Sequence, residues 1–283
     1  MNRFVGRLDR RRSHEKSSII VPILILTYTC YASDTLPYRL SGTAISEETQ
    51  DKMANAIVAF HRYIITFTDA NEFPSEKVDL TFNFDESMDV YHVSMRGGWR
   101  DSGKSFKGVV SLADPHKYDG KRMSTWRVPF DEAYFLRILL HEIAPIYLER
   151  YALANGTRFY SKPNWIVQGS EEYFSHHHGR PVKPDPVLKI FDTSSLRSLR
   201  YGIVIYNPYL DGYILFRFVP EVYGKKAALR LLSSNARTTP EILRDAINAN
   251  PKTLIARLQK FISELQEAAG SQQGNAPLDK STK

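Results

Sequence analysis

A histidine followed directly by a glutamate stands in the middle of an apolar segment. His141 and Glu142 lie within residues 131–154, whose apolar spacing and leading aspartate predict a long helix. An imidazole can bind a divalent cation or carry a proton, and a neighbouring carboxylate can act as a base toward water. On its own, such a pair is more often a hydrogen-bonded part of a core than an active site. Its interpretation therefore depends on the segments that accompany it.

Two further segments carry residues that often accompany such a pair. The pair itself lies in residues 139–145, which read LLHEIAP. Of the two further segments, residues 163–174 read PNWIVQGSEEYF on a second predicted helix. Residues 209–213, YLDGY, begin a third. In this order and at these separations the three segments resemble those of the gluzincin metallopeptidases, and above all the small peptidase-MA-like domains of bacterial secreted proteins. The resemblance covers residues 37–265 and is strongest in the two central helices.

The resemblance implies a role for each residue of the two central helices. In that family two histidines one helical turn apart bind zinc, a glutamate after the first is the base, and a glutamate on the next helix is the third ligand. His141 matches the first ligand, Glu142 the base, and Glu172 the acid that orients the first histidine. Pro145 stands at the position of the second histidine, and Gln168 at that of the glutamate ligand.

These two departures remove the expected cofactor. The proline ring has no lone pair to offer a metal, and the amide oxygen of Gln168 is a weak zinc donor compared with a carboxylate. His141 is then the only retained ligand, whereas zinc sites use three or four protein ligands. We expect no bound cofactor where the family carries zinc. Without zinc, Glu142 has no activated water to deprotonate, so we expect catalysis to be lost.

The expected function is therefore that of a peptide- or protein-binding, scaffolding module. The resemblance implies a cleft in which an extended peptide or partner protein lies beside an edge strand, and residues 107–113 are our candidate for that strand. Strand addition uses main-chain groups and needs no metal. Tyr209 is the candidate for the tyrosine that hydrogen-bonds the oxyanion in active relatives. The plainer interpretation is that His141 and Glu172 form a hydrogen-bonded core pair and that Tyr209 only fills space.

Two other functions remain open at this point. One is an active metal-dependent peptidase or hydrolase with an atypical site that uses Glu142, Glu172 and one of the histidines in the run 176–178. A replacement metal site of this kind could also recruit Glu171 with His141, and it requires these side chains to converge. The other is a purely structural part of a larger envelope assembly, which requires a large exposed apolar patch. Serine-hydrolase chemistry is not indicated, because Ser170 lies in no Gly-x-Ser-x-Gly sequence.

The N-terminus has the pattern of a secretory signal peptide. Six Lys/Arg and two acids in the first eighteen residues give a net charge of +4, and residues 18–32 are apolar. We expect residues 1–32 to be removed after Ala32 and the protein to be exported, periplasmic or extracellular. The alternative is an uncleaved membrane anchor, the only membrane contact we expect. Cleavage would remove Cys30, the single cysteine. The remaining charge is +7 − 4 = +3, which does not favour nucleic-acid binding.

Composition and periodicity predict an α+β fold for the rest. At 42% hydrophobic and 24% charged residues, the chain can build an ordinary core. We expect a zincin-like domain over residues 33–269, with a strand-rich lobe 33–180 carrying the long active-site helix, a helical lobe 181–269, and a disordered tail 270–283. The predicted strands are residues 78–84, 107–113 and 124–128. The predicted helices are residues 45–67, 85–95, 131–154, 164–178, 209–223, 225–233, 240–248 and 252–269, and glycines 97 and 98 are expected in a turn.

Overall fold

The described part of the chain is a sheet with helices on one face. A computed structural model describes residues 38–68, 78–101, 104–124, 129–177, 208–248 and 251–273. The chain divides before Leu36, and all described elements belong to the unit that begins there. Within the described residues this unit contains a four-stranded sheet and seven α-helices, so the predicted α+β class is confirmed.

The sheet is mixed, with the strand order β1-β2-β4-β3. Strands β1 (Tyr38–Gly42), β2 (Val78–Asp85) and β4 (Ser105–Ala113) run parallel to one another, and β3 (Ser94–Arg100) runs antiparallel to β4 at one edge. The two inner strands, β2 and β4, alternate between buried and less buried residues, as the sequence pattern predicts. One face of the sheet therefore supplies the core.

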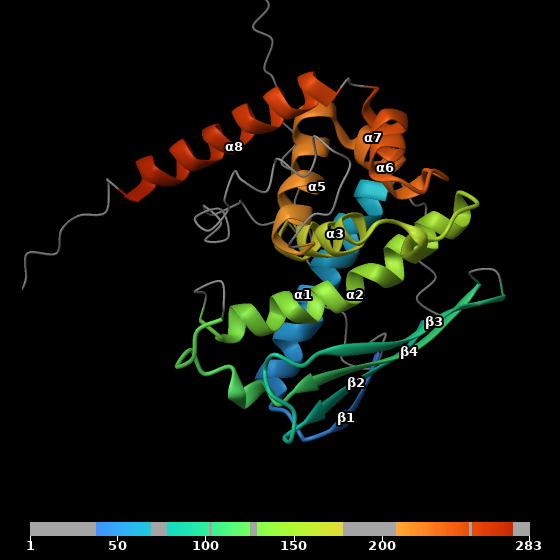
Figure 1. Ribbon diagram of the computed structural model, residues 1–283. Coiled ribbons are helices and arrows are strands. Elements are labelled where there is room, and N and C mark those ends of the chain that lie inside the picture. The colour runs from blue at the N-terminus through green and yellow to red at the C-terminus, as the bar shows by residue number, and fades with distance from the viewer. Residues whose placement is uncertain are drawn as a thin grey trace, which may run out of the picture. The chain divides into compact units, whose positions relative to one another are not determined.

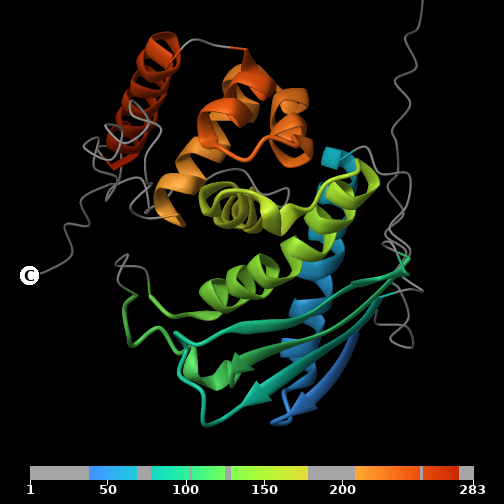
Figure 2. The same ribbon diagram turned by 45° about the vertical axis from the view of Figure 1, so that its right-hand side comes forward.

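Two helices cover that face. The views in Figures 1 and 2 agree that α1 (Glu47–Thr68) and α2 (Glu132–Ala154) cross the same side of the sheet. Phe84 of β2 meets Phe135 of α2 with ring centroids 6.2 Å apart. Asp131 caps α2 by accepting a hydrogen bond from the backbone N–H of Tyr134 at 2.9 Å. The cap and the buried face fix where α2, the helix of His141, begins and which way it faces.

The remaining helices pack beyond α2. They are α3 (Asn164–His177), α5 (Leu210–Tyr223), α6 (Lys225–Ser233), α7 (Thr239–Ile247) and α8 (Pro251–Gln273). Figures 1 and 2 show α3 lying between α2 and α5. Among the helices that the structure describes, none combines the length and apolar character needed to cross a membrane.

A glycine contact sets the crossing of α3 and α5. A Cβ on Gly169 would lie 2.3 Å from the backbone of Gly212, and one on Gly212 would lie 2.7 Å from the carbonyl oxygen of Trp165. No side chain fits at either position. The Trp165 indole N–H also donates to Thr239 Oγ1 at 2.9 Å, which ties α3 to the start of α7. Gly169 and Trp165 of the motif-like segment thus fix the position of α3.

The sequence predictions for the edge of the sheet were wrong. Residues 85–95 were predicted as a helix and glycines 97 and 98 as a turn, but residues 94–100 form β3. Residues 107–113 form a strand as predicted, yet β4 is inside the sheet and β3 is the edge. Because β3 has little side-chain burial, it shows no apolar alternation. A Cβ on Gly97 would lie 2.5 Å from the backbone of Gly108, so the close approach of β3 and β4 requires glycine there.

Two other predictions differ at their boundaries. Of the strand predicted at residues 124–128, positions 125–128 lie outside the described residues, and Met123 and Pro129 form an isolated antiparallel bridge across them. Helix α8 ends at Gln273, so the predicted tail cannot begin at Gly270. The predicted segment 1–32 and the connection between the two predicted lobes, residues 178–207, also lie outside the described residues.

Candidate functional site

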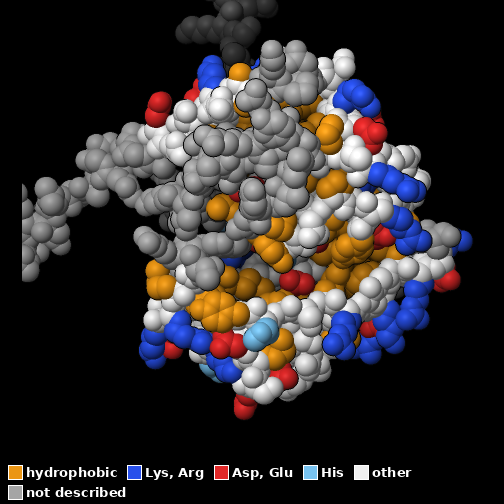
Figure 3. Space-filling model, viewed as in Figure 1, with side chains coloured by type: hydrophobic (Ala, Val, Ile, Leu, Met, Phe, Trp, Pro, Cys, Tyr) orange, Lys and Arg blue, Asp and Glu red, His pale blue; other side chains and the backbone are white. Residues whose placement is uncertain are grey.

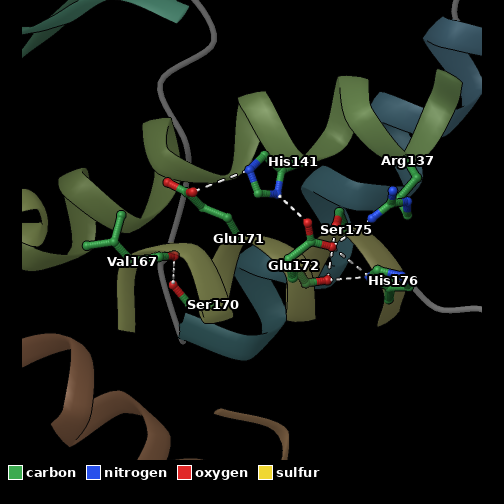
Figure 4. A network of polar contacts seen from close by, with 8 residues as sticks. All are labelled: Arg137, His141, Val167, Ser170, Glu171, Glu172, Ser175 and His176. Atoms are coloured by element: carbon green, nitrogen blue, oxygen red, sulfur yellow. Dashed lines mark hydrogen bonds and ion pairs between the residues drawn. The ribbon is translucent and has the colours of Figure 1, made fainter. Parts of the chain in front are cut away.

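The predicted site residues come together where α2 faces α3. His141 projects from α2 toward Glu171 and Glu172 of α3, as Figure 4 shows. The His141 side chain is only 12% exposed, and both glutamates are buried. Neighbouring helices therefore place three ionisable groups in a poorly solvated space, where each strongly affects the others.

Both ring nitrogens of His141 face a carboxylate. Its Nδ1 lies 3.5 Å from Glu172 Oε1, and its Nε2 lies 3.5 Å from Glu171 Oε2. The first contact joins the pair that the sequence predicts. Both distances are in the range of ion pairs and longer than the 2.7–3.2 Å usual for hydrogen bonds to nitrogen, and Nδ1 forms no hydrogen bond with the described residues. The ring is thus placed between two acids without being tightly bonded to either.

Glu172 is the ionised member of the cluster. Arg137 Nη1 donates to its Oε2 at 2.8 Å, and His176 Nδ1 lies 3.4 Å from the same oxygen. Burial raises the pKa of Glu172, but Arg137, His141 and His176 outweigh burial, so the net shift of that pKa is downward. His176 also donates from Nδ1 to the backbone carbonyl of Glu172 at 2.7 Å. Glu172 is therefore held as a carboxylate by the Arg137 guanidinium, with the His176 ring beside it.

Glu171 and Glu142 have the opposite tendency. Burial raises the pKa of Glu171 well above its ordinary value, and the charges of Glu142 and Glu172 raise it further. Burial also raises the pKa of Glu142, with a further increase from Glu172 and an opposing effect from His141. Like charges in a poorly solvated space cannot all ionise together. Glu172, whose pKa is lowered, therefore lies beside two carboxyl groups whose pKa values are raised.

Tyr209 lies beside the cluster at the start of α5. Its ring centroid is 6.2 Å from that of His141, and the residue is 42% exposed. Burial and the nearby acids Glu171, Glu142 and Glu172 raise the pKa of its hydroxyl. The structure thus brings the predicted tyrosine to His141, although α5 follows α2 by more than fifty residues in the chain.

The donor set around His141 does not fit a tightly bound zinc ion. Pro145 is buried inside α2 and has no donor atom, and Gln168 is half-buried on α3 with only a neutral amide. His141 Nε2 and Glu171 Oε2 at 3.5 Å could be two ligands of one cation, because metal–ligand bonds of about 2.1 Å at a tetrahedral angle separate ligand atoms by about 3.4 Å. The part of the chain that the structure describes places no third donor beside these two. Among the described residues no group of three or more His, Cys, Asp or Glu is arranged to hold a metal ion.

The histidine run contributes one described side chain, and it does not join His141. His176 contacts Glu172, and its ring centroid lies 5.1 Å from that of Tyr213. The side chain of His177 and all of His178 lie outside the described residues. Glu172 therefore stands between His141 and His176, with Arg137 on the same carboxylate, and a cation there would face the positive charge of Arg137.

Sequence reasoning overlooked Arg137 and gave Glu171 only a minor place. Arg137 precedes His141 by one helical turn, so the two share a face of α2, and this spacing was the available signal. Glu171 lies three residues after Gln168 and shares its face of α3 in the same way. Neither spacing alone shows which oxygen meets which nitrogen. That requires the crossing of the two helices.

Comparison with known proteins gives no independent identification. No protein-family model matches the chain, and neither a curated protein nor a solved structure matches it.

Proposed function

We propose that the chain is an exported, gluzincin-like metallopeptidase homologue with a zincin-like fold that has lost zinc and catalysis and binds an extended peptide or a partner protein. The observation that carries the proposal is the set of groups around His141. Its Nε2 meets the carboxyl group of Glu171, and the positions of the two other family ligands hold Pro145 and Gln168. Such a pocket retains the orienting acid Glu172 but offers a metal too few donors.

The proposed binding element is the edge of β3 that no other described strand pairs with. This strand ends the sheet and lies against α2, because the Trp99 indole N–H donates to the carbonyl oxygen of Ile146 at 2.7 Å. Arg150 of α2 also lies over the Trp99 ring, 5.2 Å from its centroid. An extended peptide added to β3 would gain main-chain hydrogen bonds without a metal. The edge strand is thus β3 rather than the strand at residues 107–113.

Metal analysis and kinetics of the purified full chain test the loss of catalysis. We expect less than stoichiometric zinc and no peptide hydrolysis above that of a Glu142→Gln variant. Stoichiometric zinc together with hydrolysis that Glu142→Gln abolishes would overturn the proposal. Hydrogen exchange tests the binding element: a bound peptide should slow amide exchange in residues 94–100, and protection confined to other elements would contradict a role for β3.

One observation favours a second candidate, an active metal-dependent hydrolase with an atypical site. The separation of His141 Nε2 and Glu171 Oε2 suits two ligands of one cation. In this alternative Glu142 is the base and Glu172 orients His141. Isothermal titration with Zn²⁺, Mn²⁺ and Co²⁺ separates the candidates. The alternative requires binding that both His141→Ala and Glu171→Gln weaken, whereas the main proposal expects no such binding.

A further inference from the structure

The outer edge of β3 offers main-chain groups to another strand. Within the described residues β3 pairs only with β4. This pairing uses one of the two edges of β3. Every second residue of an edge strand directs its N–H and C=O groups outward. With seven residues, β3 can pair with an extended segment about 24 Å long, at about 3.4 Å per residue. An edge of this length needs either a partner or a feature that prevents pairing.

Two arginines project from the solvent-facing side of this edge. Arg96 pairs with Val109 and Arg100 with Ser105 in the register with β4, so both share the outer face of the sheet. Both are exposed, and neither forms an ion pair or a side-chain hydrogen bond with the other described residues. Figure 3 shows Lys and Arg side chains gathered over the part of the surface that β3 and β4 occupy.

The neighbouring basic residue on the same face is already paired. Lys107 Nζ lies 3.9 Å from Asp79 Oδ2, and Arg39 of β1 pairs with the same carboxylate. Asp101, next to Arg100 in the chain, accepts a hydrogen bond from Ser105 Oγ at 3.4 Å. The Asp79 carboxylate thus offsets one of the two charges of Lys107 and Arg39, and Arg96 and Arg100 add two further positive charges at the β3 edge.

We propose that the β3 edge binds an acidic extended segment with carboxylates opposite Arg96 and Arg100. This inference rests on the proposed function and adds the chemistry of the ligand. Residues of an added strand opposite positions 96 and 100 are four apart and share a face, so the segment carries acids at positions i and i+4. Each carboxylate can take two hydrogen bonds from a guanidinium group. No atom lies within 4 Å of a Cβ placed on Gly98, which leaves room for the side chain between the acids.

The same charges argue against a second copy of this chain as the occupant. An antiparallel pair of β3 strands centred on Gly98 would place Arg96 of one copy directly opposite Arg100 of the other. Like charges at directly opposite positions destabilise a strand pair. A neutral or basic segment gains nothing from the two guanidinium groups, whereas an acidic one is attracted at each. Charge complementarity therefore selects the acidic segment.

Three labelled peptides test the charge preference by fluorescence anisotropy with the full chain. They are Thr-Glu-Val-Ser-Val-Glu-Thr and the versions in which both Glu are replaced by Gln or by Lys. The Gln peptide should bind roughly two- to thirty-fold more weakly than the Glu peptide, and the Lys peptide more weakly still. The advantage of the Glu peptide should shrink as salt rises, because the pairs are exposed. Equal binding of the Glu and Gln peptides would overturn the acidic preference.

Paired charge reversals locate the effect. Arg96→Glu with Arg100→Glu should reverse the preference, so that the Lys peptide binds better than the Glu peptide. The control, Arg62→Glu with Lys226→Glu, changes the net charge equally at exposed positions on α1 and α6 and should keep the original order. If the control reverses the order as well, the effect is one of net charge and the proposal fails.

Strand addition at β3 and the preference for acids can fail separately. If the Gln or Lys peptide binds as tightly as the Glu peptide and protects residues 94–100 from hydrogen exchange, strand addition at β3 stands and only the acidic preference is lost. If none of the three peptides binds, or if protection lies outside β3, strand addition at this edge and the acidic preference are both overturned. Metal content and hydrolysis test the loss of catalysis separately.

Discussion

At the scale of single residues, we propose that Pro145 and Gln168 prevent the site from holding a metal. The double variant Pro145→His with Gln168→Glu adds two donors, which complete the three-ligand pattern of the family together with His141. We expect it to gain zinc binding that neither single variant shows, because a tight site needs at least three protein ligands. Competition with a chromophoric chelator measures the affinity, and His141→Ala in the double variant should abolish it. A double variant without zinc affinity would mean that the pocket has also changed its shape.

The two adjacent acids of α3 should respond to pH in opposite directions. A raised folded-state pKa makes Glu171 cost stability as the pH rises above its unfolded-state pKa, because the folded state then holds a proton that the unfolded state releases. Glu171→Gln should therefore raise the free energy of unfolding by roughly 1–3 kcal/mol at pH 8 and change it little at pH 4. Urea denaturation at both pH values measures this. A loss of stability at pH 8 would show that ionised Glu171 is needed for folding.

Glu172→Gln is the matched variant at the next position. A lowered folded-state pKa makes Glu172 stabilising above its unfolded-state pKa, and this contribution is lost as the pH falls through the folded-state pKa. Removing the charge also takes away the carboxylate to which the half-buried Arg137 donates. We expect a loss of roughly 3–5 kcal/mol at neutral pH that becomes smaller in acid, by the same urea method. A loss independent of pH would assign the effect to shape instead of charge.

At the scale of elements, the glycine contact between α3 and α5 makes a direct prediction. Gly169→Ala should destabilise the fold by roughly 1–3 kcal/mol, because the added methyl group meets the backbone of Gly212. Gly98→Ala is the control, since its added Cβ has no atom within 4 Å, and should change stability by less than about 1 kcal/mol. Thermal unfolding followed by circular dichroism compares them. Equal effects at the two sites would contradict the close crossing.

The elements also show what the sequence could and could not predict. Helix α2 has a capping aspartate and a long apolar segment, and its predicted start and end agree with the structure within a residue. Strand β3 has no such pattern, because Gly97 is required by the close approach of β4 and the arginines of β3 face solvent. The edge position of β3 depends on the order of the strands in the sheet. The contact of Glu171 with His141 depends on how α2 and α3 cross. Both arise between segments that no local pattern connects.

At the scale of the whole molecule, the two predicted lobes should unfold as one. Helix α3 belongs to the predicted first lobe and α5 to the second, yet their backbones touch at Gly169 and Gly212. The buried Trp165 of α3 also donates a hydrogen bond to Thr239 of α7. Separating the lobes would expose this contact and the aromatic cluster of Tyr173, Phe174 and Phe216. Because this exposure costs free energy, neither lobe should unfold without the other. Calorimetry of the full chain should therefore give a single transition whose calorimetric and van't Hoff enthalpies agree. Gly169→Ala should lower its midpoint without splitting it, and two resolved transitions would mean that α3 and α5 do not join the lobes.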